Sequence, residues 1–332
     1  MYRNLPESVL TATLLLLFTV SCGSGGSGGG EADDDDGEMM TVVGGESMQT
    51  SMEVEVPPEQ PPTPPMPAVD SFSFIFDDDF RANNTDGFLE LLEETIGKSV
   101  EPLNTIPNIF NNTQLPVFYG NCGFANAFYS PADREIVLCD ELTETAFNFF
   151  VLVNEATGDD AFAQAILEAT SMMTFVLYHE VGHALDDITG LAVGGNFESV
   201  ADAIGTVLAV RTDQPLAPIL GALFFLQNTE GSFADVHNSG ADRAGDLLCW
   251  TLGSSSRLTE TFSGIASDLV QSGRDCVSEY ADQLEFVTQL IPNVRDLPPV
   301  GSLAKESVDE DGRLKAMDKL LSELMQGKLR KL

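Results

Sequence analysis

The pattern of apolar residues changes along the chain from alternation to helical spacing. In "SFSFIFDDDF", Phe72, Phe74 and Phe76 alternate with smaller residues, which predicts a half-buried strand at the start of the folded part. The following "DGFLELLEETIGKSVEPLNTI" has apolar residues three and four positions apart, as on one face of a helix. In "LPVFYGNCGFANAFYSPADREIVLCDEL", two β-rich runs flank the turn signal "SPAD" and predict strand, turn and strand.

The second half of the chain has helical patterns throughout. "DDAFAQAILEATSMMTFVLYHEVGHALDDITG" predicts one or two helices that begin at Asp159 or Asp160 and end at Gly190. "NFESVADAIGTVLAV" predicts a further helix, and the very apolar "APILGALFFLQN" predicts a buried helix rather than a membrane span. The tail "RLKAMDKLLSELMQGKLRKL" is amphipathic and locally basic, and it either packs on the domain or binds a partner. Early strands and late helices, without internal repeats, predict the α+β class.

Composition divides the chain into segments with different expected behaviour. Residues 23–70 are rich in Gly, Ser, Pro and acidic residues and cannot bury enough apolar surface to offset chain entropy, so we expect a disordered tether. The folded domain is expected over residues 71–292. A linker and the amphipathic helix are expected over residues 293–332.

The first 22 residues have the features of an export signal. Arg3 precedes "VLTATLLLLFTV", an apolar stretch too short to span a membrane comfortably. The "TVSC" that follows resembles a bacterial lipoprotein signal, in which Cys22 becomes acylated. Thr19 stands where such signals usually have leucine, which leaves ordinary signal cleavage as the alternative. We therefore expect an exported protein that is anchored to a membrane through Cys22 and faces the periplasm or cell exterior, or is secreted.

Four further cysteines follow the signal. An even number of cysteines in an exported chain indicates two disulfides, and the local pairs Cys122–Cys139 and Cys249–Cys276 are the preferred connectivity. Buried free thiols are the alternative. The spacing of these cysteines does not fit a structural zinc site.

The charge of the chain limits its partners. The sequence has 52 acidic and 16 basic residues, a formal net charge of −36. Such a surface repels phosphate backbones and anionic lipids, so nucleic acid is excluded as a partner, and cationic substrates are favoured.

The stretch "TFVLYHEVGHALDDITG" holds two of the three histidines in the chain. On a helix, His179 and His183 lie on one face a turn apart, where two imidazoles can bind one metal ion. Glu180 lies beside them and suits the role of general base toward a water activated by zinc. The alternative is a pair of histidines on a buried helix whose imidazoles are hydrogen-bonded within the protein core.

A catalytic zinc ion needs a third protein ligand. Glu198, Asp202 and His237 are the downstream candidates; Asp186 and Asp187, at the end of the histidine helix, rank below Glu198. We expect Glu198 to bind the metal. Asp202, one turn later, is expected to accept the N–H of a ligand histidine and so fix its tautomer. We expect Gly182, inside the motif, to allow close approach of another backbone, such as that of the "ESVAD" helix.

Several segments together carry a resemblance to a known family. "NAFYSPADREIVLCDEL", "YHEVGHAL", "FESVADAIGTVLA", "DVHNSGADRAGDLLCWTLG" and "GRDCVSEY", in this order, resemble DUF4344, a bacterial family of zinc metallopeptidases. The resemblance covers about residues 72–292, and the motif series is also similar to metallopeptidases of the gluzincin type.

The resemblance implies a zincin-like fold, in which a small twisted sheet lies beside the active-site helix and the second half is helical. It implies that His179, His183 and Glu198 bind the metal and that Glu180 is the base. Such folds often pair an extended peptide substrate with a strand near that helix, which would put "NAFYSP" or "REIVLC" at the edge of the cleft.

Hydrolysis also needs a donor for the oxyanion, and His237 or Tyr178 could supply it. Arg243 is expected to pair with a buried carboxylate, either Asp202 or Glu279. The resulting prediction is an exported zinc metallopeptidase that acts on peptides or proteins. The alternatives are an inactive metal-binding surface or adhesion domain on the same scaffold, and a zinc hydrolase of cell-wall amides.

Overall fold

The computed structural model describes residues 72–76, 87–106, 114–157, 161–190, 197–227, 240–297 and 310–326. The expected export signal with Cys22, the expected tether and the helix start at Asp159 or Asp160 lie outside the described residues. His237 also lies outside them. The proposed segment boundaries therefore stay predictions.

A four-stranded mixed sheet forms the first part of the fold. The strands are β1 (Phe72–Phe76), β2 (Leu115–Gly120), β3 (Ala127–Ser130) and β4 (Glu135–Cys139), in the order β1-β2-β4-β3. β1, β2 and β4 run parallel, and β3 runs antiparallel to β4. The predicted strand, turn and strand around "SPAD" is therefore confirmed as the β3–β4 hairpin. The apolar run of β2 forms an additional strand that the sequence pattern did not separate from its neighbours.

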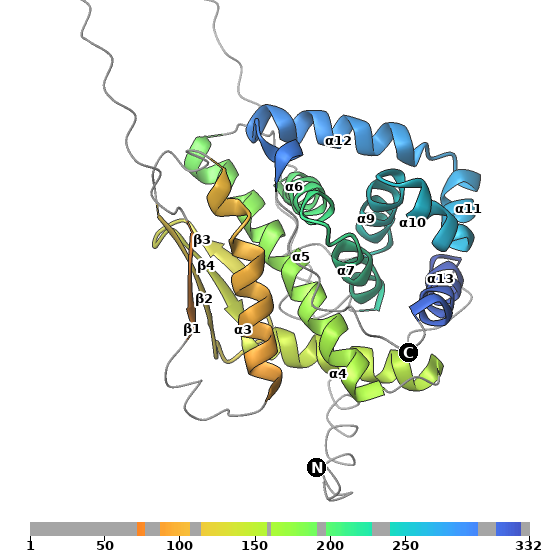
Figure 1. Ribbon diagram of the computed structural model, residues 1–332, viewed down its shortest axis with the longest axis horizontal. Coiled ribbons are helices and arrows are strands. Elements are labelled where there is room, and N and C mark those ends of the chain that lie inside the picture. The colour runs from red at the N-terminus through yellow and green to blue at the C-terminus, as the bar shows by residue number, and fades with distance from the viewer. Residues whose placement is uncertain are drawn as a thin grey trace, which may run out of the picture. The chain divides into compact units, whose positions relative to one another are not determined.

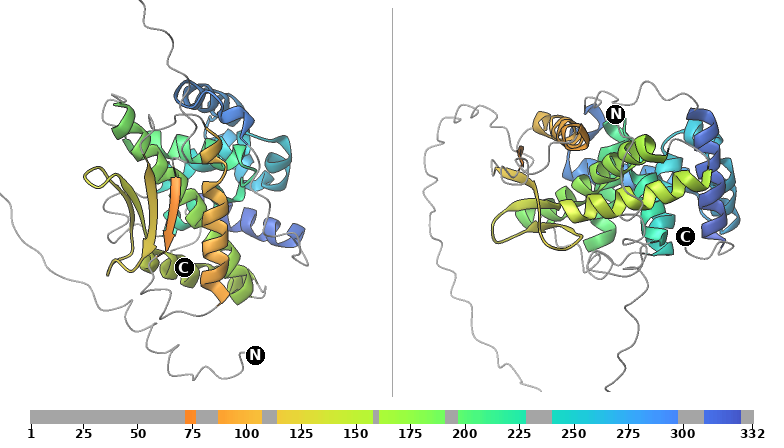
Figure 2. Two further views of the ribbon diagram at one scale, coloured as in Figure 1. Left: turned by 60° about the vertical axis from the view of Figure 1, so that its left-hand side comes forward. Right: turned by 90° about the horizontal axis from the view of Figure 1, so that it is seen from below.

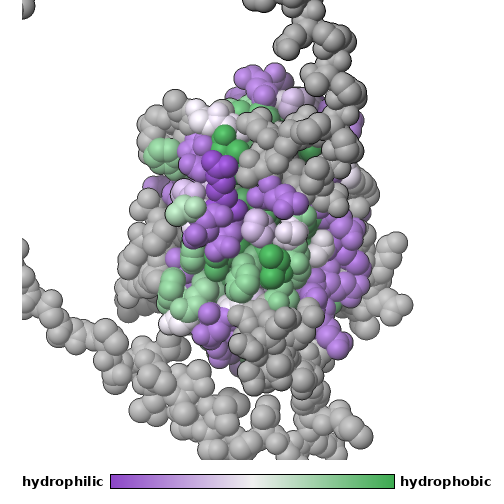
Figure 3. All heavy atoms as spheres, turned by 90° about the vertical axis from the view of Figure 1, so that its left-hand side faces the viewer, coloured by the Kyte–Doolittle hydropathy of each residue, from purple (hydrophilic) through white to green (hydrophobic). Residues whose placement is uncertain are grey.

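The two faces of this sheet differ in their burial. Leu115, Val117 and Tyr119 on β2 point to the helices and are fully buried. On the opposite face Ile75, Phe118 and Val137 lie in register across β1, β2 and β4. Figure 3 faces this side of the molecule and shows a hydrophobic area bordered by hydrophilic residues.

The inner face of the sheet packs on helices that surround one long central helix (Figures 1 and 2). The central helix is α5 (Ala161–Thr189), a single helix of 29 residues. It contacts α3 (Gly87–Val100), which ends before the short 3-10 turn η1 (Leu103–Thr105), and α4 (Asp140–Thr157). The sequence analysis did not predict α4, because "AFNFFVLV" is an apolar run without clear helical spacing.

The rest of the described chain is helical, as predicted. It forms the following elements: α6 (Phe197–Arg211), α7 (Leu216–Gln227), α9 (Ala241–Gly253), α10 (Ser256–Thr261), α11 (Ser263–Gln271), α12 (Cys276–Leu290), η2 (Val294–Asp296) and α13 (Glu310–Met325). The apolar α7 is buried in the core. Within the described ranges, no helix has the length and apolarity that a membrane crossing requires. The α+β class is confirmed.

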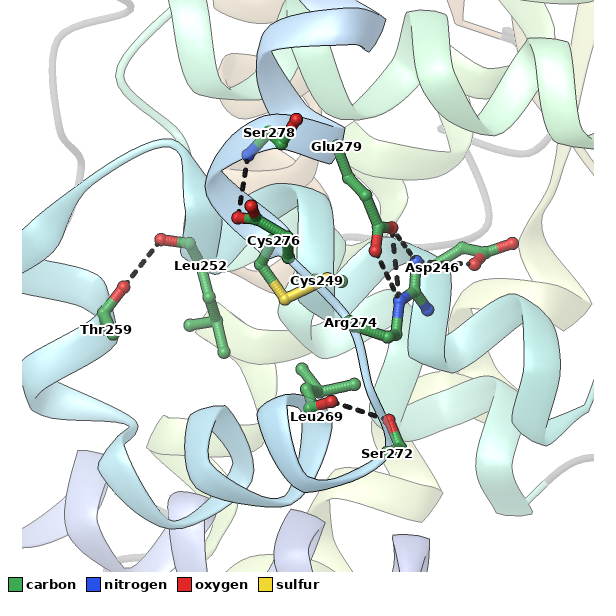
Figure 4. The surroundings of a disulfide bond; sticks show 11 residues. Asp246, Cys249, Leu252, Thr259, Leu269, Ser272, Arg274, Cys276, Ser278 and Glu279 are labelled. Atoms are coloured by element: carbon green, nitrogen blue, oxygen red, sulfur yellow. Dashed lines mark hydrogen bonds and ion pairs between the residues drawn. A yellow bond between two sulfur atoms is a disulfide. The ribbon is translucent and has the colours of Figure 1, made fainter.

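Two disulfides join the expected cysteine pairs. Cys122 and Cys139 link the loop after β2 to the end of β4, and Cys249 links α9 to Cys276 at the start of α12. Figure 4 shows the second bridge beside an ion-pair group in which Arg274 contacts Asp246 and Glu279. The preferred connectivity is therefore confirmed.

The amphipathic tail helix packs on the domain. Asp318 of α13 accepts the main-chain N–H groups of Gly264 and Ile265 at 2.9 Å each, at the start of α11. Met317 and Leu321 of the same helix are buried. The contact answers the question that the sequence left open, in favour of packing within the chain.

Candidate metal centre

The crossing of α5 and α6 brings the histidines to the acidic residues. A Cβ atom at Gly182 would lie 2.6 Å from the Cα atom of Ala201, so only glycine permits this approach of the two helices. Gly205 has the same function one turn further along α6, where a Cβ atom would lie 3.0 Å from the main-chain nitrogen of His179. The expected close backbone approach at Gly182 is therefore confirmed, and its partner is the "ESVAD" helix.

Four atoms that could bind a metal converge at this crossing: two imidazole nitrogens and the two oxygens of one carboxylate. The Nε2 atoms of His179 and His183 lie 3.0 Å apart. Glu198 has one carboxylate oxygen 3.4 Å from His179 Nε2 and the other 3.3 Å from His183 Nε2. Atoms that bind one tetrahedral zinc ion at about 2.0–2.1 Å lie roughly 3.3 Å from one another. Two imidazoles and a carboxylate with these separations fit a centre that holds one metal ion.

Asp202 holds His179 from the side away from the converging atoms. Its Oδ1 lies 2.9 Å from His179 Nδ1, so this N–H donates to the carboxylate and the lone pair of Nε2 faces the other ligands. Asp202 is itself buried and is held by Arg243 of α9, whose Nε and Nη2 donate to its two oxygens at 2.5 and 2.7 Å. Burial alone would raise the pKa of Asp202, but the charge of Arg243 and the hydrogen bonds from His179 and Arg243 keep this pKa below its ordinary value.

The formal charges of the cluster also fit a divalent cation. Glu180, Glu198 and Asp202 contribute −3 and Arg243 contributes +1, a sum of −2. Burial lowers the pKa of His183, but its hydrogen bond to Glu198 and the charges of Glu180 and Glu198 outweigh burial and raise this pKa above 6.5. A cation is therefore favoured at the point between the imidazoles and the carboxylates.

Glu180 faces the edge of the sheet. Its Oε2 accepts the main-chain N–H of Tyr129 on β3 at 2.9 Å. The phenol of Tyr129 donates to Asp187 at 2.9 Å, two turns further along α5. Tyr129 therefore joins the strand to the histidine helix at two points, and burial together with the Asp187 bond raises its pKa to about 12.

Among the described strands, β3 is the outermost one on the side of the sheet beside the site. β4 pairs with β2 on one side and β3 on the other, so "REIVLC" is not an edge strand and "NAFYSP" is. The N–H of Cys139 donates to the carbonyl oxygen of Asn126, which turns the main-chain groups of Asn126, Phe128 and Ser130 toward β4. The main-chain groups of Ala127 and Tyr129 therefore face away from β4, and the N–H of Tyr129 is the one that donates to Glu180.

The structure corrects one expected site residue. Tyr178 does not reach the converging ligand atoms, because its hydroxyl is buried and donates to the carbonyl oxygen of Ser99 at 2.9 Å. The expectation that Tyr178 donates to an oxyanion is wrong: the residue before His179 on a helix points to a different face, here toward α3. Of the two partners considered for Arg243, Asp202 is the observed one; Glu279 pairs with Arg274.

Sequence reasoning missed two features of the site. The N–H of Tyr129 that holds Glu180 is a main-chain group, for which the sequence carries no signal. Arg243 was expected to pair with a carboxylate, but its further contact with Glu198, at 3.4 Å from Nη1 to Oε2, was not foreseen.

Comparison with known proteins adds a family match. The model of DUF4344, described as "Putative metallopeptidase", matches residues 83–290, which is more than half of the chain. No curated protein and no solved structure matches the chain.

Proposed function

Because the chain belongs to the DUF4344 family of metallopeptidases, we propose that it is a zinc-dependent peptidase. His179, His183 and Glu198 would hold the metal, and Asp202 would orient His179. The observation that carries this proposal is the spacing of two imidazole nitrogens, 3.0 Å apart, and the two oxygens of Glu198, each 3.3 or 3.4 Å from one of these nitrogens, which is close to the separation of ligand atoms around one tetrahedral ion.

The chemistry divides between the metal and Glu180. When bound, zinc polarises a carbonyl oxygen and lowers the pKa of water. Glu180 takes a proton from the attacking water and passes it to the leaving amine as the C–N bond breaks. The N–H of Tyr129 holds one oxygen of the Glu180 carboxylate between the strand and the histidine helix, which supports this role.

The family match supports a peptide as the substrate. β3 is an edge strand of the sheet among the described residues, and the N–H of its Tyr129 holds Glu180, so a substrate bound beside this strand would lie next to the proposed base. His237 remains our proposed donor to the oxyanion.

The export features complete the proposal. An N-terminal signal and acylation of Cys22 would place the peptidase outside the cytoplasm on a lipid anchor. The two disulfides support an oxidising compartment.

The experiment compares the wild type with Glu180→Gln, which keeps the ligands and removes the base. Zinc content is measured by mass spectrometry on protein purified without added metal, and cleavage is measured on casein and on a peptide library. Glu144→Gln, on the exposed face of α4, is the matched control. We expect zinc in all three proteins and cleavage only by the wild type and the control.

Two results would contradict the proposal. If the wild type holds no divalent metal, the proposal of a metal centre is contradicted. Wild type that holds zinc but is as inert as Glu180→Gln on every peptide would favour an inactive metal-binding domain, and release of cell-wall fragments instead of peptides would favour an amide hydrolase.

A further inference from the structure

Arg243 is the residue that connects the outer carboxylate of the centre with a metal ligand. Its Nε and Nη2 contact Asp202, and its Nη1 lies 3.4 Å from Oε2 of Glu198. We propose that Arg243 is a positioning residue of the metal centre, whose planar guanidinium aligns Asp202 and Glu198 so that His179 and Glu198 present their ligand atoms to one ion. This inference rests on the proposed function only in that the centre binds a divalent metal.

The contacts form a fork rather than a single ion pair. Two parallel N–H groups of the guanidinium meet the two oxygens of Asp202, which fixes the plane of that carboxylate. In this plane Oδ1 is also 2.9 Å from His179 Nδ1. Rotation of Asp202 would break the contact with His179, and Nη2 of Arg243 also lies 3.2 Å from Nδ1 of the same imidazole, so the fork and this direct contact together orient the ring.

The surroundings of Arg243 hold the guanidinium in place. The residue is only 8% exposed, and its guanidinium carbon lies 4.4 Å from the ring centre of Phe225 on α7. The stack limits rotation of the side chain.

The position of Arg243 does not stabilise the helix that carries it. It lies in the first turn of α9 (Ala241–Gly253), where the helix dipole disfavours a positive charge. The contacts with Asp202, Glu198 and Phe225 have to outweigh that effect. An arginine at this place is therefore explained by the carboxylates of the centre.

Arg243 could act only as a counter-charge or as a positioning residue, and the two roles predict opposite changes in metal affinity when it is removed. If Arg243 acted only by its charge, its removal would strengthen binding of a dication, because a nearby positive charge repels the metal. If it positions the carboxylates, its removal weakens binding. The variant Arg243→Lys keeps the charge and loses the fork, so it isolates the geometric contribution.

The test measures zinc affinity by competition with a chromophoric chelator, which does not depend on activity. We expect Arg243→Lys and Arg243→Gln to bind zinc about 10- to 100-fold more weakly than the wild type, as changes around metal ligands typically do. Arg274→Lys is the matched control, because Arg274 also contacts two carboxylates, Asp246 and Glu279, neither of which is a proposed metal ligand. The control should bind zinc like the wild type.

Every outcome decides the proposal. Wild-type affinity in Arg243→Lys, or tighter binding by Arg243→Gln, would overturn it. If neither variant folds, Phe225→Leu, which removes the ring and keeps the arginine, should weaken zinc binding in the same direction, and wild-type affinity there overturns the proposal. Wild type that binds zinc but cleaves nothing would contradict the proposed function alone; wild type that binds no metal would contradict both.

Discussion

Gly182 of α5 and Ala201 of α6 touch so closely that a methyl group at position 182 would lie 2.6 Å from the Cα atom of Ala201. This contact sets the distance between the helix that carries His179 and His183 and the helix that carries Glu198. The glycine within the histidine motif is therefore part of the geometry of the metal centre.

Gly182→Ala should push α6 away from α5. We expect a loss of about 1–3 kcal/mol in the free energy of unfolding from overpacking. Weaker zinc binding should accompany it, because Glu198 moves with α6. Urea denaturation and chelator competition measure the two effects. Gly97→Ala is the control: it lies in α3 with nothing within 4 Å of the added Cβ atom, so the helix should gain up to about 1 kcal/mol. Equal changes in unfolding free energy and in zinc affinity for Gly182→Ala and Gly97→Ala would contradict the close packing of α5 and α6.

The stabilisation by zinc should depend on pH through His183. In the metal-free protein the pKa of His183 is above 6.5, so a proton on this residue stabilises the fold fully below pH 6.5. That contribution is lost as the pH rises through the folded pKa. Zinc needs the neutral imidazole, so its stabilising effect grows over the same range.

Thermal unfolding with zinc and with chelator, from about pH 5 to about pH 8, measures this difference. We expect the increase in Tm on adding zinc to become larger as the pH rises. His183→Ala should lose most of the increase at every pH. An increase in the wild type that stays constant over the range would be evidence against His183 as a ligand.

The disulfide between Cys249 and Cys276 should stabilise the helical half (Figure 4). It closes a segment with a sequence separation of 27 residues, so its removal in the double variant Cys249→Ser, Cys276→Ser should cost about 2–4 kcal/mol. Urea denaturation of the oxidised proteins measures the cost. The double variant at Cys122 and Cys139 should lose a similar amount, because loop entropy changes slowly with length. A double variant at Cys249 and Cys276 as stable as the wild type would show that this bridge does not constrain the chain.

Asp318 should be needed to dock the C-terminal helix. Asp318→Ala removes the acceptor of two N–H groups at the start of α11, and we expect a loss of about 1–3 kcal/mol. Glu323→Ala on the same helix is the control, because its contact with the exposed Lys319 is worth about 0–1 kcal/mol. Chemical denaturation of both variants should separate them clearly. Equal losses would mean that apolar contacts alone hold α13.

Local spacing was sufficient for several parts of the fold. Alternation predicted β1, the turn signal predicted the β3–β4 hairpin, and helical spacing predicted α5, α6 and α7. Spacing was not sufficient for α4, whose apolar run fits strand or helix until its neighbours α5 and β4 are known. It also could not separate β2, whose parallel partners β1 and β4 are not its neighbours along the chain.

The sequence by itself determined that His179 and His183 share one face of a helix, because a spacing of four residues is one helical turn, and that Glu180 lies beside them. It also indicated which cysteines pair. Only the tertiary structure decided that Glu198 meets both imidazoles, that Tyr178 turns away from them, and that Tyr129 and Arg243 join the site. These contacts depend on how α5, α6, α9 and β3 pack, and packing between distant segments is set by the shapes of whole surfaces rather than by any local pattern.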